Sequence, residues 1–205
     1  MLASAANLLY SLSRCPVCKA RPSSARGCCS VCAAALFSPR IDGFELTLGR
    51  YEGRLEGAIK AFKFRGVTRL GVLFGEAMAE AVRENSWPID LICPMPLHLS
   101  RRLERGYNQA AIITQTAARR LNVPHRYALT RLRATQQQAR LERRARQQNV
   151  TGAFRSLPLR GERVLLVDDV MTSGATLTEC GLALLEAGAG QVYTAAVAKA
   201  PRPSG

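Results

Sequence analysis

Short apolar runs alternate with segments of helical spacing along most of the chain. Three segments have the length and apolar content of strands: 44–48, 89–93 and 164–167. Four segments have the apolar spacing of amphipathic helices: 52–64, 68–84, 108–121 and 175–187. Strands that alternate with helices favour an α/β fold, in which helices flank a parallel sheet.

The segment 164–176, VLLVDDVMTSGAT, joins an apolar strand to two carboxylates and a hydroxyl-rich turn. Asp168 and Asp169 fall at the carboxyl end of the predicted strand, the edge where open α/β sheets bind ligands. Carboxylates there can accept hydrogen bonds from ribose hydroxyls or help to hold a hydrated divalent cation. The turn and the start of the next helix offer hydroxyls and backbone amides that suit a phosphate. The residues that offer them are Thr172, Ser173, Gly174, Ala175 and Thr176.

Three other interpretations of this segment compete with a sugar-phosphate pocket. VLLVDD resembles the acidic second motif of nucleotide hydrolases, but the sequence has no GxxxxGKS/T motif to hold a triphosphate. It also resembles the start of a response-regulator receiver domain, but too few residues follow Asp169 to form one. The plainest alternative is an ordinary strand, turn and helix with a solvated acidic turn. The complete order of strand, acids, turn and helix favours the sugar-phosphate interpretation.

Four of the seven cysteines form two CxxC pairs, Cys15 with Cys18 and Cys29 with Cys32. Two such pairs can close a tetrahedral thiolate site around zinc. The alternative is a pair of disulfides, which a reducing cytoplasm does not favour. Cys28 could replace Cys29 as a ligand. Zinc would supply the folding energy of so small a module, whose role is either to cap the main domain or to dock a partner or DNA.

The net charge is +14, and 25 of the 29 basic residues are arginine. A field of that sign attracts nucleic acids as well as small phosphates. The segment 131–150 concentrates arginines but has no aromatic residue to stack on bases, so a site that reads a base sequence is not expected there.

No apolar run reaches the roughly 18 residues that span a bilayer. The first residues also lack the basic start of a secretory signal. We therefore expect a cytoplasmic protein without membrane insertion. An oligomer is compatible with the composition, which does not specify the oligomeric state.

The segment 164–176 resembles the phosphoribosyl pyrophosphate signature of type I phosphoribosyltransferases: an apolar strand, two acids, and a turn rich in Thr, Ser and Gly. Ser173 stands where a second Thr is common, and it keeps the hydroxyl. Further segments narrow the resemblance to the ComF/GntX family of competence-associated, phosphoribosyltransferase-like proteins. They are the CxxC pairs, YEGRLEGAIKAFKFRG from Tyr51, CPMPLHLSRRLERGYNQA from Cys93 and QQQARLERRARQQNVTGAF from Gln136.

The resemblance implies a type I phosphoribosyltransferase-like fold with a small zinc module before it. Residues 1–40 would form an N-terminal helix and the zinc module, 41–200 the transferase-like domain, and 201–205 a tail. Within the domain, 41–85 would be a hood over the acceptor base, and 131–150 a flexible loop that closes over the ligand. Lys60 and Lys63 lie in the predicted helix of this hood, and a solvated basic face explains them equally well.

The resemblance also implies roles for single residues. Asp168, Asp169, Arg105 and Arg144 would be catalytic: the acids would fix the ribose hydroxyls and, with Mg²⁺, orient the pyrophosphate. Residues 172–176 would hold the 5-phosphate. Arg105, beside a predicted pyrophosphate loop at 94–98, and Arg144, in the flexible loop, would neutralise the leaving group. Transfer at the anomeric carbon would then depend on position and electrostatics, without a protein nucleophile.

Two functions of different classes follow from the resemblance. The first is a Mg²⁺-dependent phosphoribosyltransferase that binds phosphoribosyl pyrophosphate or a nucleotide and acts on an unknown base or amine. The second is a noncatalytic factor for DNA uptake that keeps the pocket as a sensor and engages single-stranded DNA or DNA-uptake proteins. Both imply a role in competence or in the use of DNA as a nutrient.

Overall fold

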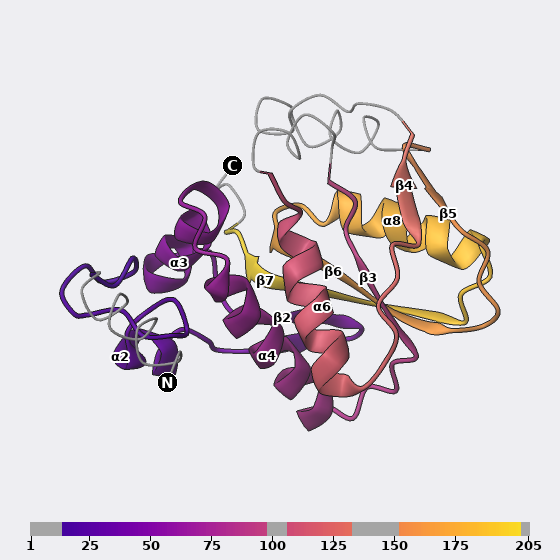
Figure 1. Cartoon of the computed structure of the whole chain (residues 1–205). Coiled ribbons are helices and arrows are strands. Elements are labelled where there is room, and N and C mark those ends of the chain that lie inside the picture. Colours follow the sequence, from indigo (N-terminus) through magenta and orange to yellow (C-terminus); the bar gives the residue numbers. More distant parts are fainter. Residues whose placement is uncertain (1–13, 98–105, 133–151, 202–205) are drawn as a thin grey trace, which may run out of the picture.

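The computed structural model describes residues 14–97, 106–132 and 152–201 (Figure 1). Its main sheet has the strand order β1-β2-β7-β6-β3. The strands are β1 (Arg40–Asp42), β2 (Glu45–Thr47), β3 (Leu91–Pro94), β6 (Arg163–Met171) and β7 (Gln191–Lys199). β1 pairs antiparallel with β2, whereas the pairs β2 with β7, β7 with β6 and β6 with β3 are parallel. The predicted parallel sheet is therefore present, with one antiparallel strand at its edge.

Helices cover both faces of this sheet (Figure 1). On one face, α3 (Gly53–Phe64), α4 (Arg69–Glu84) and α6 (Gln109–Leu121) share a core with Leu165 and Val167 of β6. On the other face, α8 (Ala175–Glu186) packs with Val164 and Leu166. These β6 residues divide between the two faces because successive side chains of a strand point to opposite sides of the sheet. All four helices begin and end within one residue of their predicted bounds.

The central strand β6 is longer than the sequence predicts. It continues to Met171 and so contains Asp168 and Asp169 instead of ending before them. β7 supports this extension, because Val170 and Met171 pair with Ala198 and Lys199. Asp168 pairs with Ala196 of β7, and Asp169 follows it within the same strand.

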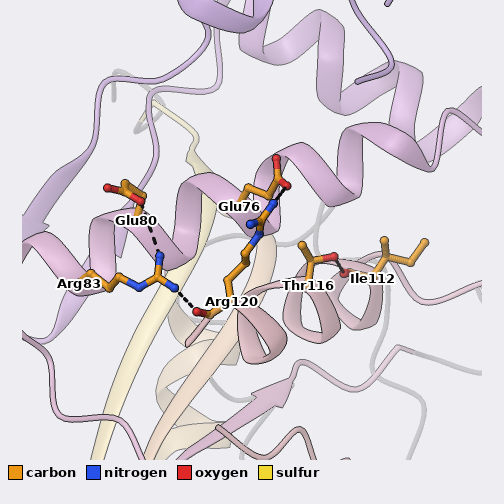
Figure 2. Close-up of polar contacts among 6 residues, drawn as sticks. All are labelled: Glu76, Glu80, Arg83, Ile112, Thr116 and Arg120. Carbon is orange, nitrogen blue, oxygen red and sulfur yellow. Dashed lines mark hydrogen bonds and ion pairs between the residues drawn. The ribbon is translucent and has the colours of Figure 1, made fainter. Parts of the chain in front are cut away.

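Helices α4 and α6 lie against each other at two glycines of α4. Gly71 faces Ile112, and Gly75 faces Thr116. Figure 2 shows the polar contacts that accompany this packing. Arg120 of α6 pairs with Glu76 of α4, and Arg83 pairs with Glu80 at 3.7 Å while it donates to the carbonyl oxygen of Arg120. The segment predicted as a hood thus contributes α4 to the main core, where Phe74 and Met78 are fully buried.

A second, two-stranded sheet pairs β4 (Leu129–Arg131) with β5 (Phe154–Ser156) in antiparallel fashion. Arg131, the first residue of the predicted flexible loop, belongs to β4. The remainder of that loop, from 133 to 150, lies outside the described residues, as does Arg144.

The N-terminal module contains a cysteine-bearing turn and the short helix α2 (Ser30–Ala34). The predicted N-terminal helix within 1–13 and the tail residues 202–205 lie outside the described residues. Within the described part of the chain, no helix combines the length and the apolar character needed to cross a membrane.

Candidate functional site

Asp169 forms an ion pair with Lys63, which lies in the last turn of α3. The Lys63 Nζ atom is 2.7 Å from Asp169 Oδ1. The side chain of Lys63 is 16% exposed and that of Asp169 is 12% exposed. A solvated basic face, one of the two sequence interpretations of Lys60 and Lys63, therefore fits Lys60 but not Lys63. Lys60 is exposed and pairs with Glu56 one turn earlier in α3.

Asp168 has different neighbours from Asp169. Its Oδ1 atom accepts a hydrogen bond of 2.7 Å from the backbone N–H of Asp169. On α8, burial raises the pKa of the Cys180 thiol, and the nearby negative charge of Asp168 raises it further. Because neighbouring residues of a strand point to opposite faces, one acid lies towards α3 and the other towards α8. The two carboxylates thus meet different helices at one end of β6.

The turn from Thr172 to Gly174 connects β6 to α8. Gly174 has a φ of +79°, a conformation that residues with a Cβ rarely adopt. As the residue before α8, it has no side chain to cap the first turn, and Ser173 Oγ accepts only a long hydrogen bond of 3.4 Å from the N–H of Ala175. Thr172 and Ser173 are exposed. Exposed hydroxyls at the positive end of a helix macrodipole suit an anion.

The loop that leaves β3 is fastened to the start of α6. Asn108 donates from its side-chain amide to the carbonyl oxygen of Met95 at 3.1 Å. Its Oδ1 atom also accepts from the N–H of Ala110 at 3.0 Å and so caps α6. Tyr107 donates to the carbonyl oxygen of Phe62 in α3. The base of the predicted pyrophosphate loop is thereby tied to the helix that carries Lys63.

The structure places the predicted site residues as follows. Asp168 and Asp169 lie in β6, residues 172–174 form the turn, and Ala175 and Thr176 begin α8. Arg105 lies outside the described residues, as Arg144 does. Sequence reasoning did not pair Lys63 with Asp169, because the two residues are distant along the chain. The signal in the sequence for a buried Lys63 was its position next to Phe62, on the apolar side of the predicted helix.

The sulfur atoms of Cys15, Cys18, Cys29 and Cys32 all lie within 4.8 Å of one another. Cys18 Sγ and Cys29 Sγ are 3.8 Å apart. A tetrahedral zinc with Zn–S bonds of about 2.3 Å holds its thiolates about 3.8 Å apart. The cluster therefore has the geometry of a metal centre, and the ligand set expected from the sequence is the one that comes together.

Backbone hydrogen bonds reach the sulfur atoms of three of these cysteines. The backbone N–H of Cys29 donates to Cys15 Sγ at 3.3 Å, and that of Cys32 donates to Cys29 Sγ at 3.4 Å. Backbone hydrogen bonds from Ala20, and further ones from Arg21, lower the pKa of Cys18 to about 6, which favours a thiolate at neutral pH.

Cys28 is not part of this cluster, although it precedes Cys29. It is fully buried, and burial raises the pKa of its thiol to about 11. Its sulfur is not among the four that lie within 4.8 Å of one another. The structure thus favours Cys29 over Cys28 in the second CxxC pair.

The cysteine module is fastened to the main domain by two arginines. Arg65, just after α3, donates to the carbonyl oxygen of Pro16 at 3.0 Å. Arg69, at the start of α4, donates to the carbonyl oxygen of Ala25 at 3.1 Å. These contacts place the module beside the same helices that cover the sheet (Figure 1).

Comparisons with known proteins agree with this architecture. A family model described as "Phosphoribosyl transferase domain" matches residues 107–204. Competence protein F of Haemophilus influenzae is 33% identical over 163 residues, which cover 75% of this chain and 71% of that protein. DNA utilization protein YhgH of Escherichia coli (strain K12) is 40% identical over 105 residues, which cover 50% of this chain and 46% of that protein. The match to this second relative thus spans about half of its length.

Among solved structures, glutamine phosphoribosylpyrophosphate amidotransferase from Bacillus subtilis superposes with a TM-score of 0.45 and 20% identity, covering 63% of this chain and 26% of that one. The similarity to Competence protein F extends over more than two thirds of both chains. The chain therefore belongs to the ComF family, and its fold is that of a type I phosphoribosyltransferase with a cysteine cluster at the N-terminal side.

Proposed function

We propose that this protein binds phosphoribosyl pyrophosphate, together with Mg²⁺, where β6 meets the start of α8. The observation that carries the proposal is the order of groups from Asp168 to Thr176: two acids on a central strand, an exposed hydroxyl turn, and the N-terminus of a 12-residue helix. This order offers acceptors to ribose hydroxyls next to donors for a phosphate. The match of residues 107–204 to the phosphoribosyl transferase domain supports it.

Each part of the site has a distinct task in this proposal. Asp168 and Asp169 accept hydrogen bonds from the ribose hydroxyls, and residues 172–176 bind the 5-phosphate. Mg²⁺, when bound with the pyrophosphate, neutralises the charge of that leaving group. Arg105 and Arg144 are proposed to do the same from segments outside the described residues. Release of pyrophosphate to an acceptor base or amine would make the protein a phosphoribosyltransferase.

We propose zinc as the metal of the cysteine cluster. Four sulfur ligands at tetrahedral spacing suit zinc, and no ligand position remains for a substrate. The proposed role of this zinc is therefore structural. A cytoplasmic location is consistent with it, because reducing conditions keep such thiols out of disulfides.

The proposed biological role is DNA uptake or the use of DNA as a nutrient. It is supported by the names of two relatives, Competence protein F and DNA utilization protein YhgH. The net charge of +14 is favourable for contact with single-stranded DNA. A noncatalytic factor, in which ligand binding changes affinity for DNA or uptake proteins, is the alternative to a transferase within this role.

The test of the binding site is calorimetric titration of the zinc-loaded protein with phosphoribosyl pyrophosphate, with and without Mg²⁺. We expect saturable binding that Mg²⁺ strengthens. Asp168→Asn and Asp169→Asn should each weaken it about tenfold or more, because each removes a charge-assisted hydrogen bond. Glu186→Gln is the matched control: it also removes one negative charge, at the exposed far end of α8.

The two roles are then separated by what the bound ligand does. If bases or amines are screened with bound phosphoribosyl pyrophosphate, release of pyrophosphate with one acceptor identifies a transferase. Ligand-dependent binding of single-stranded DNA without pyrophosphate release identifies the noncatalytic factor. If the wild-type protein does not bind the ligand, or if both Asn variants bind as it does, the proposed site is wrong.

A further inference from the structure

The Lys63–Asp169 ion pair differs in burial from the other ion pairs in the described ranges. In each of the other seven, both side chains are at least 27% exposed. In this pair, both are below 20%. Asp169 is also the only carboxylate that is buried among the described residues. The attraction between two charges removed from water must offset the hydration that both lose. Removing either partner would leave the other charge buried and unpaired, which is destabilising.

The end of α3 that carries Lys63 is held in place by the residues on either side. Phe62 packs against Phe74 with a ring distance of 5.6 Å, and its carbonyl oxygen accepts from Tyr107. Arg65, two residues after Lys63, donates to Pro16 of the cysteine module. Lys63 therefore extends from a helix end that is fixed on both sides, and its charge is brought to Asp169 by the fold.

The Lys63 ammonium supplies the positive charge that a metal ion could otherwise supply to Asp169. A buried carboxylate that stays ionised is stabilised by a positive partner, either a basic side chain or a metal cation. Mg²⁺ would approach the oxygens to about 2.0–2.1 Å and keep several waters. An ammonium at 2.7 Å already occupies Asp169 Oδ1 and repels a second cation. The acid next to the proposed ribose position is thus neutralised without metal.

We infer that Lys63 is a positioning residue that takes the place of a divalent cation at Asp169. As a result, the acid pair binds the ribose of a sugar phosphate without metal, and Mg²⁺ enters only with the pyrophosphate. The part that concerns ribose rests on the proposed function, whereas the exclusion of metal from Asp169 does not.

The first test uses no sugar ligand. Zinc-loaded protein is titrated with Mn²⁺, a stand-in for Mg²⁺, and free Mn²⁺ is followed by electron paramagnetic resonance. We expect Lys63→Met to bind one Mn²⁺ at least tenfold more tightly than the wild type, because Asp169 then lacks a cation. Lys60→Met is the matched control, from the same helix and exposed, and should behave as the wild type. The double variant Lys63→Met with Asp169→Asn should lose the added Mn²⁺ site.

The second test uses the wild-type protein, so it does not depend on the folding of a variant. Ribose 5-phosphate is titrated in metal-free buffer and again with saturating Mg²⁺, and phosphoribosyl pyrophosphate is titrated likewise. We expect the affinity for ribose 5-phosphate to change by less than twofold, and that for phosphoribosyl pyrophosphate to rise with Mg²⁺.

The outcomes separate this inference from the proposed function. Equal Mn²⁺ uptake by wild type and Lys63→Met, or a tenfold gain of ribose 5-phosphate affinity from Mg²⁺, overturns the inference while the ligand site stands. Failure of the wild type to bind either sugar phosphate overturns the proposed function instead, and the Mn²⁺ titration then decides the exclusion of metal from Asp169.

Discussion

Gly75 of α4 and Thr116 of α6 lie so close that a Cβ added at position 75 would be 2.6 Å from the Cβ of Thr116. It would also lie 2.5 Å from the carbonyl oxygen of Ile113, which belongs to the backbone and cannot move aside cheaply. We expect Gly75→Ala to lower the free energy of unfolding by about 1–3 kcal/mol, the usual cost of overpacking. Urea denaturation of the wild type and the variant measures this change in the free energy of unfolding.

Gly57 in α3 provides the control for this variant. A Cβ there would meet its nearest atom, the carbonyl oxygen of Val17, at 3.9 Å. Gly57→Ala should leave stability unchanged or raise it by about 0.5–1 kcal/mol, because alanine favours the helix. Equal effects of the two variants would contradict the close packing of α4 on α6.

Zinc content distinguishes the two neighbouring cysteines. We expect Cys29→Ala to lose most of its zinc, because it removes one of the four clustered sulfurs. Cys28→Ala should keep one zinc per chain, since Cys28 is buried outside the cluster of four sulfurs. Elemental analysis of both purified variants measures this. Zinc loss from Cys28→Ala with retention by Cys29→Ala would reverse the assignment.

Arg65 should slow the release of zinc. Its guanidinium donates to the carbonyl oxygen of Pro16, between the first two cysteines. Removing one such hydrogen bond, worth about 0.5–1 kcal/mol, should speed zinc transfer to a chromogenic chelator roughly two- to fivefold in Arg65→Met. Arg54→Met is the control, because Arg54 is exposed at the other end of α3. Equal rates for all three proteins would show that the contact does not hold the module.

His125 should make stability depend on pH below neutrality. Burial lowers its pKa from the ordinary value of 6.5. The unfolded chain then binds the proton more readily, so the contribution is complete above pH 6.5 and is lost as the pH falls towards the folded pKa. We expect the urea midpoint to fall more in wild type than in His125→Gln between pH 7.5 and 5.5.

One hydrogen bond to Thr114 involves the ring of His125. The fully buried Thr114 hydroxyl has one proton, which it donates to the carbonyl oxygen of Ala110 at 2.8 Å. His125 Nε2, 2.9 Å from the same hydroxyl oxygen, therefore acts as the donor. The chain has one other histidine, which is present in both the wild type and His125→Gln. The difference between their two pH profiles therefore reports on His125. Parallel pH profiles would contradict the lowered pKa.

Local patterns predicted the four long helices well, because apolar spacing and the residues at helix ends determine where each begins and ends. The CxxC spacing likewise predicted the sulfur cluster, since both pairs are short and local. β7 was missed, although Val192, Tyr193 and Val197 are buried along it. Three of its residues are alanine, which favours helices over strands, and only pairing with β2 and β6 makes the segment a strand.

The candidate site was predicted in part for the same reason. The acids and the hydroxyl turn are contiguous in sequence, so one motif contains them. The burial of Asp169 against Lys63 depends on how α3 crosses the end of β6, which no local pattern encodes. The different surroundings of Asp168 and Asp169 depend on the extension of β6 to Met171, which pairing with β7 supplies.

The parallel pairing of β2 with β7 has a consequence for the order of folding. Thr194 donates to the carbonyl oxygen of Phe44, a contact that spans 150 residues. A ribosome makes β2 early and β7 last, so a growing chain can fold its cysteine module on metal long before the sheet can close. Contacts of such long range also slow folding. Until β7 inserts between β2 and β6, α3 has no fixed position over Asp169, and the proposed ligand site is among the last parts of the molecule to form.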